Sequence, residues 1–204
     1  MSQPSGDFEL VQIVDVSLAE VARRAGPHLV CRPGCTQCCY GAFSINALDA
    51  ERLRTGMKAL RAAEPSAAQA IEDRARAWLA TYSADFPGDP KTGQLGASED
   101  DRERFEDFAN DAPCPALDPA TGLCGVYASR PMTCRVFGPP VRMAAAGNAD
   151  DNAEALGHCQ LCFIGATQEE VAACEMPVPH ELEANLLDEI PDKSDTVVAF
   201  ALLL

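Results

Sequence analysis

Residues 31–39 read Cys-Arg-Pro-Gly-Cys-Thr-Gln-Cys-Cys, which places four thiols within nine positions of a 204-residue chain. Five more cysteines fall in two later clusters, Cys114-x9-Cys124-x9-Cys134 and Cys159-x2-Cys162, and Cys174 stands alone. Thiols gathered from distant segments serve as metal ligands, redox groups or disulfides. The rest of the sequence favours metal binding first, redox chemistry second and disulfides last.

Composition argues against a scaffold held together by disulfides. A chain of this length buries a core of its own, and 47% of its residues are hydrophobic. Residues 1–7 carry no signal-peptide features, so we expect a cytoplasmic protein, in which clustered cysteines more often bind metal than cross-link. The adjacent pair Cys38-Cys39 also fits poorly in a simple disulfide framework.

Charge and hydropathy exclude two classes of partner. The net charge is −15, and no stretch rich in Lys and Arg is present, so we expect no nucleic-acid partner. The longest apolar run, residues 196–204, is far shorter than the ~20 residues that span a bilayer. We therefore expect no membrane partner, and the remaining candidate is an unknown redox or protein partner.

Hydrophobic periodicity predicts a mainly α protein with short strands and extensive irregular loops; a small α+β domain is the alternative. Apolar residues recur at helical spacing in 47–63, which Asn46 caps, and in 67–84, which Ser66 caps. Joined at Pro65, these two helices form an expected helical hairpin. The other expected elements are a polar leader at 1–10, a helix from Ser17 to Gly26, a helix at 98–108, short strands at 136–137 and 141–143, a loop at 144–157, a helix after Thr167, a helix at 179–190 and a buried tail at 196–204.

We expect residues 1–204 to form a single compact domain organised around a cysteine-rich metal site. Residues 28–165 are the expected metal-binding core, and residues 166–204 supply C-terminal helices and the apolar tail. Proline and glycine are frequent at 110–143, which indicates an irregular backbone built around a bound group.

Thiolates are soft ligands, and four of them serve either zinc or a 4Fe–4S cluster. The pairs Cys35-x2-Cys38 and Cys159-x2-Cys162 have the spacing that lets two sulfurs converge on one ion. Cys134 lies near Arg130 and Arg135, whose guanidinium groups would lower a thiol pKa and offset the charge of a sulfur-rich site. The alternative for both arginines is pairing with surface carboxylates.

Several residues have alternative assignments. One of Cys38 and Cys39 is expected to enter a metal site while the other packs, binds a second metal or stays reactive. His28 and His158 are alternates for a sulfur ligand, and Cys174 is expected to be a buried structural thiol. No catalytic residue stands out, because the sequence lacks GxGxxG, Walker A, HExxH and GxSxG motifs.

The three-cysteine spacing of Cys31, Cys35 and Cys38 also matches radical S-adenosylmethionine enzymes. Those enzymes have an aromatic residue just before the last cysteine, and this chain has Gln37 there. It also lacks the alternating strands and helices that they require. We therefore reject this interpretation.

Taken with Cys114-Pro-Ala-Leu-Asp, Thr-Gly-Leu-Cys124-Gly-Val-Tyr and Arg-Pro-Met-Thr-Cys134-Arg-Val-Phe, the opening stretch resembles the YkgJ-type cysteine-cluster family, CxxCxxCC, over roughly residues 28–165. The resemblance implies a zinc- or iron-chelating domain in which about eight cysteines hold metal. The implied ligands are Cys31, Cys35, Cys38, Cys39, Cys114, Cys124 and Cys134, with Cys159 or Cys162 as the eighth.

The leading hypothesis is a metal-binding protein whose cysteines hold an iron–sulfur cluster or zinc, with electron transfer or another redox step as its role. If the protein is an enzyme, this hypothesis predicts an iron–sulfur oxidoreductase. One alternative is a structural zinc module without catalysis that presents an acidic surface to partners. A second alternative is a metal-independent thiol enzyme that uses Cys39 or Cys174.

Overall fold

The computed structural model describes residues 4–142 and 156–203. Within them the chain divides into two compact units. Unit 1 contains residues 4, 33–131 and 186–203, and unit 2 contains residues 5–32, 132–142 and 156–185. The cysteine-rich stretch 31–39 therefore passes from unit 2 into unit 1 after Arg32. The single domain expected over 1–204, with its core at 28–165, stays a prediction.

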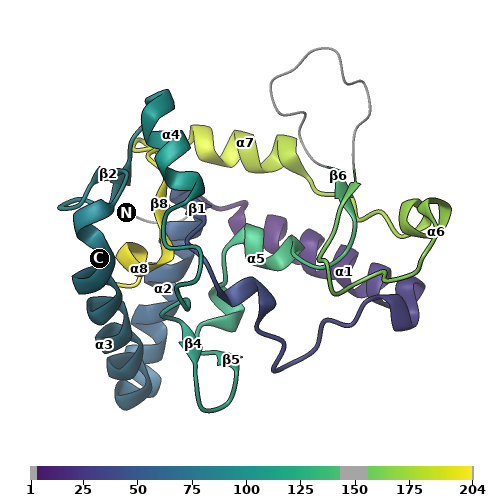
Figure 1. Cartoon of the computed structure of the whole chain (residues 1–204), viewed down its shortest axis with the longest axis horizontal. Coiled ribbons are helices and arrows are strands. Elements are labelled where there is room, and N and C mark those ends of the chain that lie inside the picture. The colour runs from purple at the N-terminus through teal and green to yellow at the C-terminus, as the bar shows by residue number, and fades with distance from the viewer. Residues whose placement is uncertain (1–3, 143–155, 204) are drawn as a thin grey trace. The chain divides into compact units, whose positions relative to one another are not determined.

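The mainly α class is confirmed: eight α-helices and eight two-residue strands occur in the described residues (Figure 1). The strands pair as four separate two-stranded sheets. No helix in the described part of the chain is long and apolar enough to cross a membrane.

Unit 1 is built on the predicted helical hairpin, α2 (Ala47–Ala63) and α3 (Pro65–Tyr82). Helix α2 has the predicted bounds because the Asn46 side chain accepts a hydrogen bond from the Asp49 N–H at 3.0 Å. Helix α3 begins two residues earlier than predicted and without the expected Ser66 cap. Pro65 occupies its first turn, where the missing N–H costs nothing.

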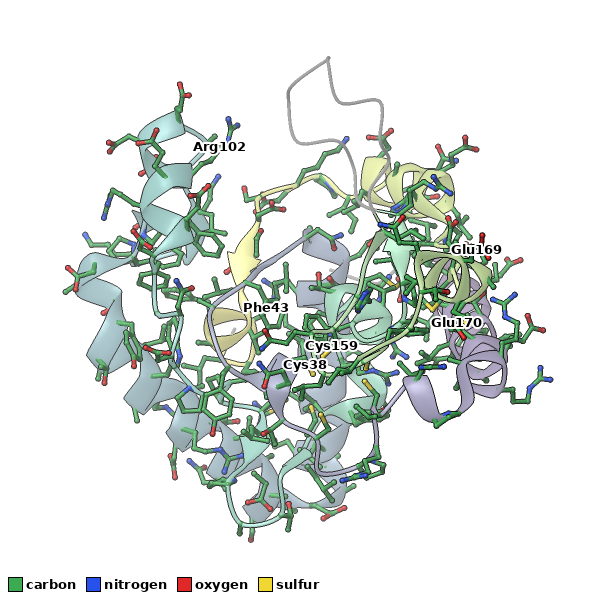
Figure 2. The ribbon with its side chains drawn as sticks, turned by 45° about the vertical axis from the view of Figure 1, so that its right-hand side comes forward. Cys38, Phe43, Arg102, Cys159, Glu169 and Glu170 are labelled. Carbon is green, nitrogen blue, oxygen red and sulfur yellow. The ribbon has the colours of Figure 1, made fainter. Side chains whose placement is uncertain are left out.

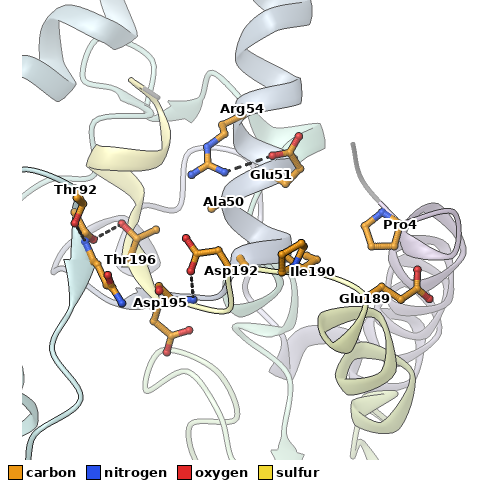
Figure 3. A pocket seen from close by; sticks show the side chains of 15 residues that line it. Pro4, Ala50, Glu51, Arg54, Thr92, Glu189, Ile190, Asp192, Asp195 and Thr196 are labelled. Carbon is orange, nitrogen blue, oxygen red and sulfur yellow. Dashed lines mark hydrogen bonds and ion pairs between the residues drawn. The ribbon is translucent and has the colours of Figure 1, made fainter. Parts of the chain in front are cut away.

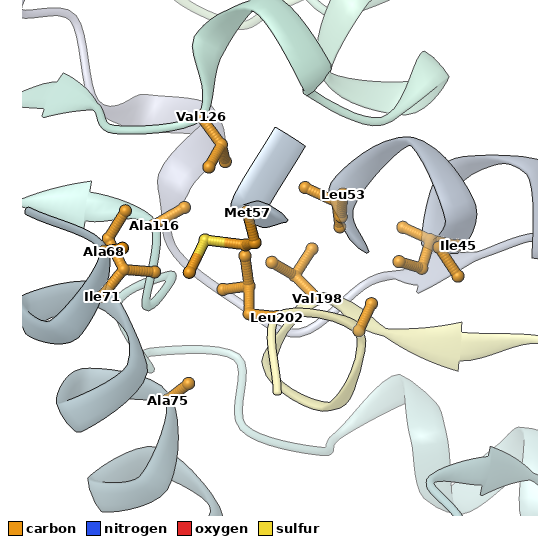
Figure 4. Close-up of a cluster of buried hydrophobic side chains, with 12 residues drawn as sticks. Ile45, Leu53, Met57, Ala68, Ile71, Ala75, Ala116, Val126, Val198 and Leu202 are labelled. Carbon is orange, nitrogen blue, oxygen red and sulfur yellow. The ribbon is translucent and has the colours of Figure 1, made fainter. Parts of the chain in front are cut away.

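A buried apolar cluster fills the space between α2, α3 and the C-terminal segment (Figure 4). The predicted buried tail is confirmed as strand β8 (Thr196–Val197) and helix α8 (Val198–Ala201). Strand β8 pairs antiparallel with β1 (Ser44–Ile45), with Ser44 opposite Val197. The cluster consists of Ile45, Ala50, Leu53, Met57, Ala68, Ile71, Ala75, Ala116, Val126, Val198, Ala201 and Leu202.

A second cluster in unit 1 is aromatic. Trp78 packs edge-on against Phe108 at 5.8 Å between ring centroids, and Phe86 joins both Phe108 and Phe200. Helix α4 (Glu99–Glu106) lies inside the predicted 98–108 range and is capped by Ser98. The remaining strands of unit 1 are β2 (Gly88–Asp89) with β3 (Gln94–Leu95), and β4 (Leu117–Asp118) with β5 (Leu123–Cys124).

Unit 2 opens with α1 (Asp7–Ala25), which starts ten residues before the predicted helix and takes up residues 7–10 of the expected polar leader. Leu10, Val14 and Val21 supply its buried face, so apolar spacing continues upstream of Ser17. The helix ends at Gly26 as predicted, with that glycine at φ 50°.

The rest of unit 2 agrees with prediction in part. Helix α5 (Met132–Val136) contradicts the strand expected at 136–137, whereas β6 (Val141–Arg142) confirms its neighbour and pairs with β7 (Leu156–Gly157). Residues 144–155 of the expected loop lie outside the described residues. Helix α6 (Gln168–Ala173) has the predicted capping box at Thr167, and α7 spans His180–Asp188, of which residues 180–185 belong to unit 2.

Candidate metal centre

Backbone hydrogen bonds bring the first cysteines of unit 1 next to Cys114. Cys38 and Cys39 lie on a 3-10 turn (Gln37–Cys39), in which the Cys39 N–H donates to Thr36 O at 2.8 Å (Figure 2 labels Cys38). The Cys114 N–H donates to Cys39 O at 2.7 Å, and the Gly41 N–H donates to Ala112 O at 2.9 Å. Segments 39–41 and 112–114 are therefore joined at their backbones.

The β4–β5 hairpin adds Cys124 to this neighbourhood. Cys124 lies opposite Leu117 in the strand register. Leu117 follows Cys114 by only three residues, so the pairing brings Cys124 close to Cys114. At the hairpin tip, Gly122 has φ 70°, and a β-carbon there would lie 3.5 Å from Gly34 Cα. The tip therefore lies against the loop that carries Cys35. Cys114 and Cys124 both pack against the apolar cluster of unit 1.

The thiols of Cys38 and Cys39 share a hydrogen bond that shifts their pKa values in opposite directions. The Cys39 thiol donates to Cys38, which lowers the pKa of Cys38 to about 6, and the Arg130 charge acts in the same direction. The pKa of Cys39 is raised because its proton is held by Cys38, and burial and the nearby Cys114 and Cys124 raise it further. Cys38 is therefore the thiolate of the pair at neutral pH.

Burial has the opposite effect on the other two thiols. It raises the pKa of Cys114 to about 11, and it also raises the pKa of Cys124. Each of these thiols affects the titration of Cys38 or Cys39, so the four act on one another. We name Cys38, Cys39, Cys114 and Cys124 the four-thiol group.

Arg130 supplies positive charge to the four-thiol group. Its side chain is buried, its Nη1 donates to Tyr127 O at 3.0 Å, and its guanidinium carbon lies 4.0 Å from the centre of the Tyr127 ring. Its charge lowers the pKa of both Cys38 and Cys124. The sequence analysis quoted Tyr127 only within the family motif and gave it no role, although it lies three residues before Arg130.

Unit 2 holds the other predicted ligands. The sulfurs of Cys31 and Cys162 are 3.8 Å apart. Cys159 and Cys162 are both buried, and Cys134 lies on α5. The two Cys-x2-Cys pairs thus belong to different units, and their convergence on one ion stays a prediction, as does the ligand role of every cysteine in the predicted set.

The remaining sequence candidates have other contacts. Arg135 is buried and forms an ion pair with Asp15 on α1, with Nη1 to Oδ1 at 2.7 Å, and its site-directed role stays a prediction. His28 and His158 both contact the ring of Phe163, at 5.8 and 5.4 Å between centroids.

The thiol-enzyme alternative used Cys39 or Cys174, and both environments disfavour a nucleophile. The raised pKa of Cys39 keeps that thiol protonated. Cys174 is buried at the C-terminal end of α6, as expected of a structural thiol. Among the described residues, no three Cys, His, Asp or Glu side chains are already positioned as ligands of one ion.

Unit 1 also contains a cavity of about 400 Å³ that no cysteine lines (Figure 3). It lies between the first half of α2, the β2–β3 turn and residues 189–196. Two of its carboxylates have internal donors, since Asp192 accepts from the Ser194 N–H and Asp195 from the Ser44 hydroxyl. It is therefore a separate feature from the four-thiol group.

Comparison with known families agrees with the chemistry of this donor set. The sequence model of the family described as "CxxCxxCC: Putative zinc- or iron-chelating domain" matches residues 30–162, which is more than half of the chain. All nine predicted cysteine ligands fall within that range. Neither the curated proteins nor the solved structures gave a match.

Proposed function

Because this chain belongs to the CxxCxxCC family, we propose that the four-thiol group of unit 1 is a metal centre and that it holds an iron–sulfur cluster. The observation that carries the proposal is the backbone pairing that joins segments 39–41 and 112–114 and the β4–β5 hairpin that adds Cys124, which together gather four thiols from three segments of the chain. Thiolate sets of this kind suit iron–sulfur clusters and zinc and not hard cations such as magnesium or calcium.

Charge balance supports a metal at this position. A thiolate at Cys38 forms readily, but burial opposes ionisation of Cys114 and Cys124. A bound cation replaces those protons, so loading the centre releases protons and weakens as pH falls. Arg130 offsets part of the remaining negative charge from its buried position next to Tyr127.

A redox role is the finer part of the proposal. An iron–sulfur cluster supplies one-electron transfer. Tyr40, directly after Cys39, is 53% exposed, and Tyr127, under Arg130, is 61% exposed. Two accessible aromatic side chains therefore border the four-thiol group, and a redox partner protein would reach the centre at that edge. The enzymatic form of this proposal is an iron–sulfur oxidoreductase.

Structural zinc is the second candidate, and one observation favours it. Cys114 and Cys124 pack against the apolar cluster between α2 and α3. A zinc ion on the four-thiol group would fix the 39–41 segment and the β4–β5 hairpin to that cluster, as structural zinc does in small domains. In this case the protein would be an interaction module without catalysis.

The test is metal analysis and visible absorption of the full chain purified without oxygen. An iron–sulfur centre gives brown protein with stoichiometric iron and sulfide, whereas zinc gives colourless protein. Cys38→Ser and Cys114→Ser should both lose the metal, and Cys174→Ser is the matched control that should keep it. Wild-type protein without stoichiometric iron or zinc would overturn the proposal.

A further inference from the structure

Unit 2 contains a pair of thiols outside the four-thiol group. Cys31 is exposed, Cys162 is 1% exposed, and their sulfurs lie 3.8 Å apart. A disulfide bond is ~2.05 Å long, so the two sulfurs need to approach each other by about 1.8 Å to form one. We propose that Cys31 and Cys162 form a reversible disulfide when the protein meets a small disulfide oxidant such as glutathione disulfide.

Backbone contacts hold the two cysteine segments together on both sides of the pair. The Phe163 N–H, directly after Cys162, donates to His28 O at 2.7 Å. The rings of His28 and Phe163 stack with an angle of 9° between their planes. The Cys159 N–H donates to Gly138 O at 3.2 Å. The segments that carry Cys31 and Cys162 are thus joined before any bond forms between their sulfurs.

Two local features point to a specialised loop. Phe163 has φ 58°, a left-handed conformation that a residue with a large side chain seldom adopts. Such strain concentrates at functional positions. Gly138 lies directly against the Cys31 sulfur, because a β-carbon at residue 138 would be 2.8 Å from Cys31 Sγ. Because Gly138 has no side chain, the Cys31 sulfur can occupy its position close to the Cys162 sulfur.

The exposure of the two thiols assigns their roles. The exposed Cys31 thiolate attacks one sulfur of glutathione disulfide, which forms a Cys31–glutathione mixed disulfide and releases one glutathione thiolate. The buried Cys162 thiolate then attacks the Cys31 sulfur, which forms the Cys31–Cys162 bond and releases a second glutathione thiolate. Two protein thiols are oxidised, one glutathione disulfide is reduced to two glutathione thiolates, and the two protons lost by the protein thiols are taken up by these thiolates through solvent.

This disulfide differs from the structural disulfides that composition disfavours. A cytoplasmic thiol pool would keep the pair reduced, and the bond would form only as the glutathione pool becomes oxidised. It is also independent of the proposed metal centre, since neither sulfur belongs to the four-thiol group. Metal content is therefore measured alongside: the cross-link without stoichiometric metal in the untreated protein would count against the metal proposal alone, and retained metal without the cross-link would count against the disulfide alone.

The experiment treats the full chain with glutathione disulfide, blocks the remaining thiols with N-ethylmaleimide and identifies linked peptides by mass spectrometry. Because trypsin does not cleave the Arg32–Pro33 bond, Cys31 lies in the tryptic peptide 25–52 together with Cys35, Cys38 and Cys39, and fragment-ion spectra identify which of these four is linked. The double variant C159S/C174S leaves Cys162 as the sole cysteine of its own tryptic peptide. The wild type and this double variant should both give the Cys31–Cys162 link.

Two further variants assign the order of the steps. Cys162→Ser should lose the link and retain glutathione on Cys31, whereas Cys31→Ser should lose the link and leave Cys162 without glutathione. Circular dichroism checks that both variants fold. The proposal is overturned if Cys31 in the wild type keeps its glutathione with Cys162 free, if the link joins Cys31 to Cys159, or if both thiols react only after a chelator removes a metal.

Discussion

Both units gather cysteines, but different neighbours surround them. In unit 1, Arg130 and the apolar cluster of the helical hairpin adjoin four thiols whose ionisation is coupled by hydrogen bonding and charge. In unit 2, the Phe163 N–H bond to His28 O joins the segments that carry the Cys31–Cys162 pair, and the Cys31 sulfur lies against the bare backbone of Gly138. The comparison teaches that spacing alone does not assign a thiol its chemistry, because the charge and packing around the sulfur decide it.

The units also differ in how they bury an arginine, and the largest expected effect tests this difference. In unit 1, Arg52 is 3% exposed and pairs with Asp49, which is 2% exposed. Arg52→Met would remove the Arg52 cation from that buried carboxylate, so we expect a loss of about 3–5 kcal/mol in unfolding free energy. Urea unfolding followed by circular dichroism measures it.

The matched control in unit 2 is Arg135→Met. Arg135 is 2% exposed, but its partner Asp15 is 46% exposed and can regain water, so we expect a smaller loss of about 1–2 kcal/mol. Equal losses in the two variants would contradict the contrast between the units. A single cooperative transition in these experiments would also support the predicted single domain.

The next effect concerns the reactivity of Cys38 in metal-free protein. Its pKa of about 6 means that it is a thiolate at neutral pH, whereas an ordinary thiol with a pKa of ~8.5 is mostly protonated. Alkylation of Cys38 should therefore rise with pH to a plateau whose midpoint lies near 6. Arg130→Gln should move that midpoint upward, since it removes a charge that favours the thiolate.

Arg104→Gln is the control for this titration, because the Arg104 guanidinium pairs with Asp101 on α4 and not with a thiol. It should leave the midpoint unchanged. A midpoint near 8.5 in the wild type, or one that does not respond to Arg130→Gln, would mean that Arg130 and Cys39 do not act on Cys38 as described. Fragment-ion spectra of the tryptic peptide 25–52 separate alkylation of Cys38 from alkylation of Cys31.

Local signals in the sequence predicted some elements well. Asn46 and the apolar spacing after it gave the bounds of α2, because a side-chain cap and a helical repeat act within a few residues. The start of α1 was missed because Gly6, at its N-terminal end, makes no side-chain cap. The strand predicted at 136–137 failed for a related reason: five residues of α5 are too few to show a helical repeat.

The grouping of cysteines could be predicted only in part. Their metal-binding chemistry follows from the residue type and from the order of motifs. The division of the cysteines between the two units does not follow from the sequence, because Cys31 and Cys35 are four residues apart yet belong to different units. That boundary arises from long-range contacts, such as the Phe163 N–H bond to His28 O and the Cys114 N–H bond to Cys39 O. The spacing of cysteines along the sequence does not reveal these long-range contacts.

The smallest expected effects come from one helix cap in each unit. Asn46→Ala removes the acceptor for the Asp49 N–H in unit 1, and Thr167→Ala removes the capping box of α6 in unit 2. Each should cost about 1 kcal/mol. Hydrogen exchange should show faster exchange at the start of α2 in the first variant and of α6 in the second.

Asn46→Asp and Thr167→Ser keep the acceptor oxygen and serve as controls for the two caps. They should exchange like the wild type at these helices. If alanine and the conservative residue behave alike, the caps contribute nothing measurable to either unit.

The most direct measurement of the central claim is the metal content of two multiple variants purified without oxygen. One replaces the four-thiol group of unit 1 with serine, and the other replaces Cys31, Cys134, Cys159 and Cys162 of unit 2. We predict that the unit 1 variant loses its iron or zinc while the unit 2 variant retains the wild-type stoichiometry. Metal retained in the unit 1 variant and lost from the unit 2 variant would contradict the account.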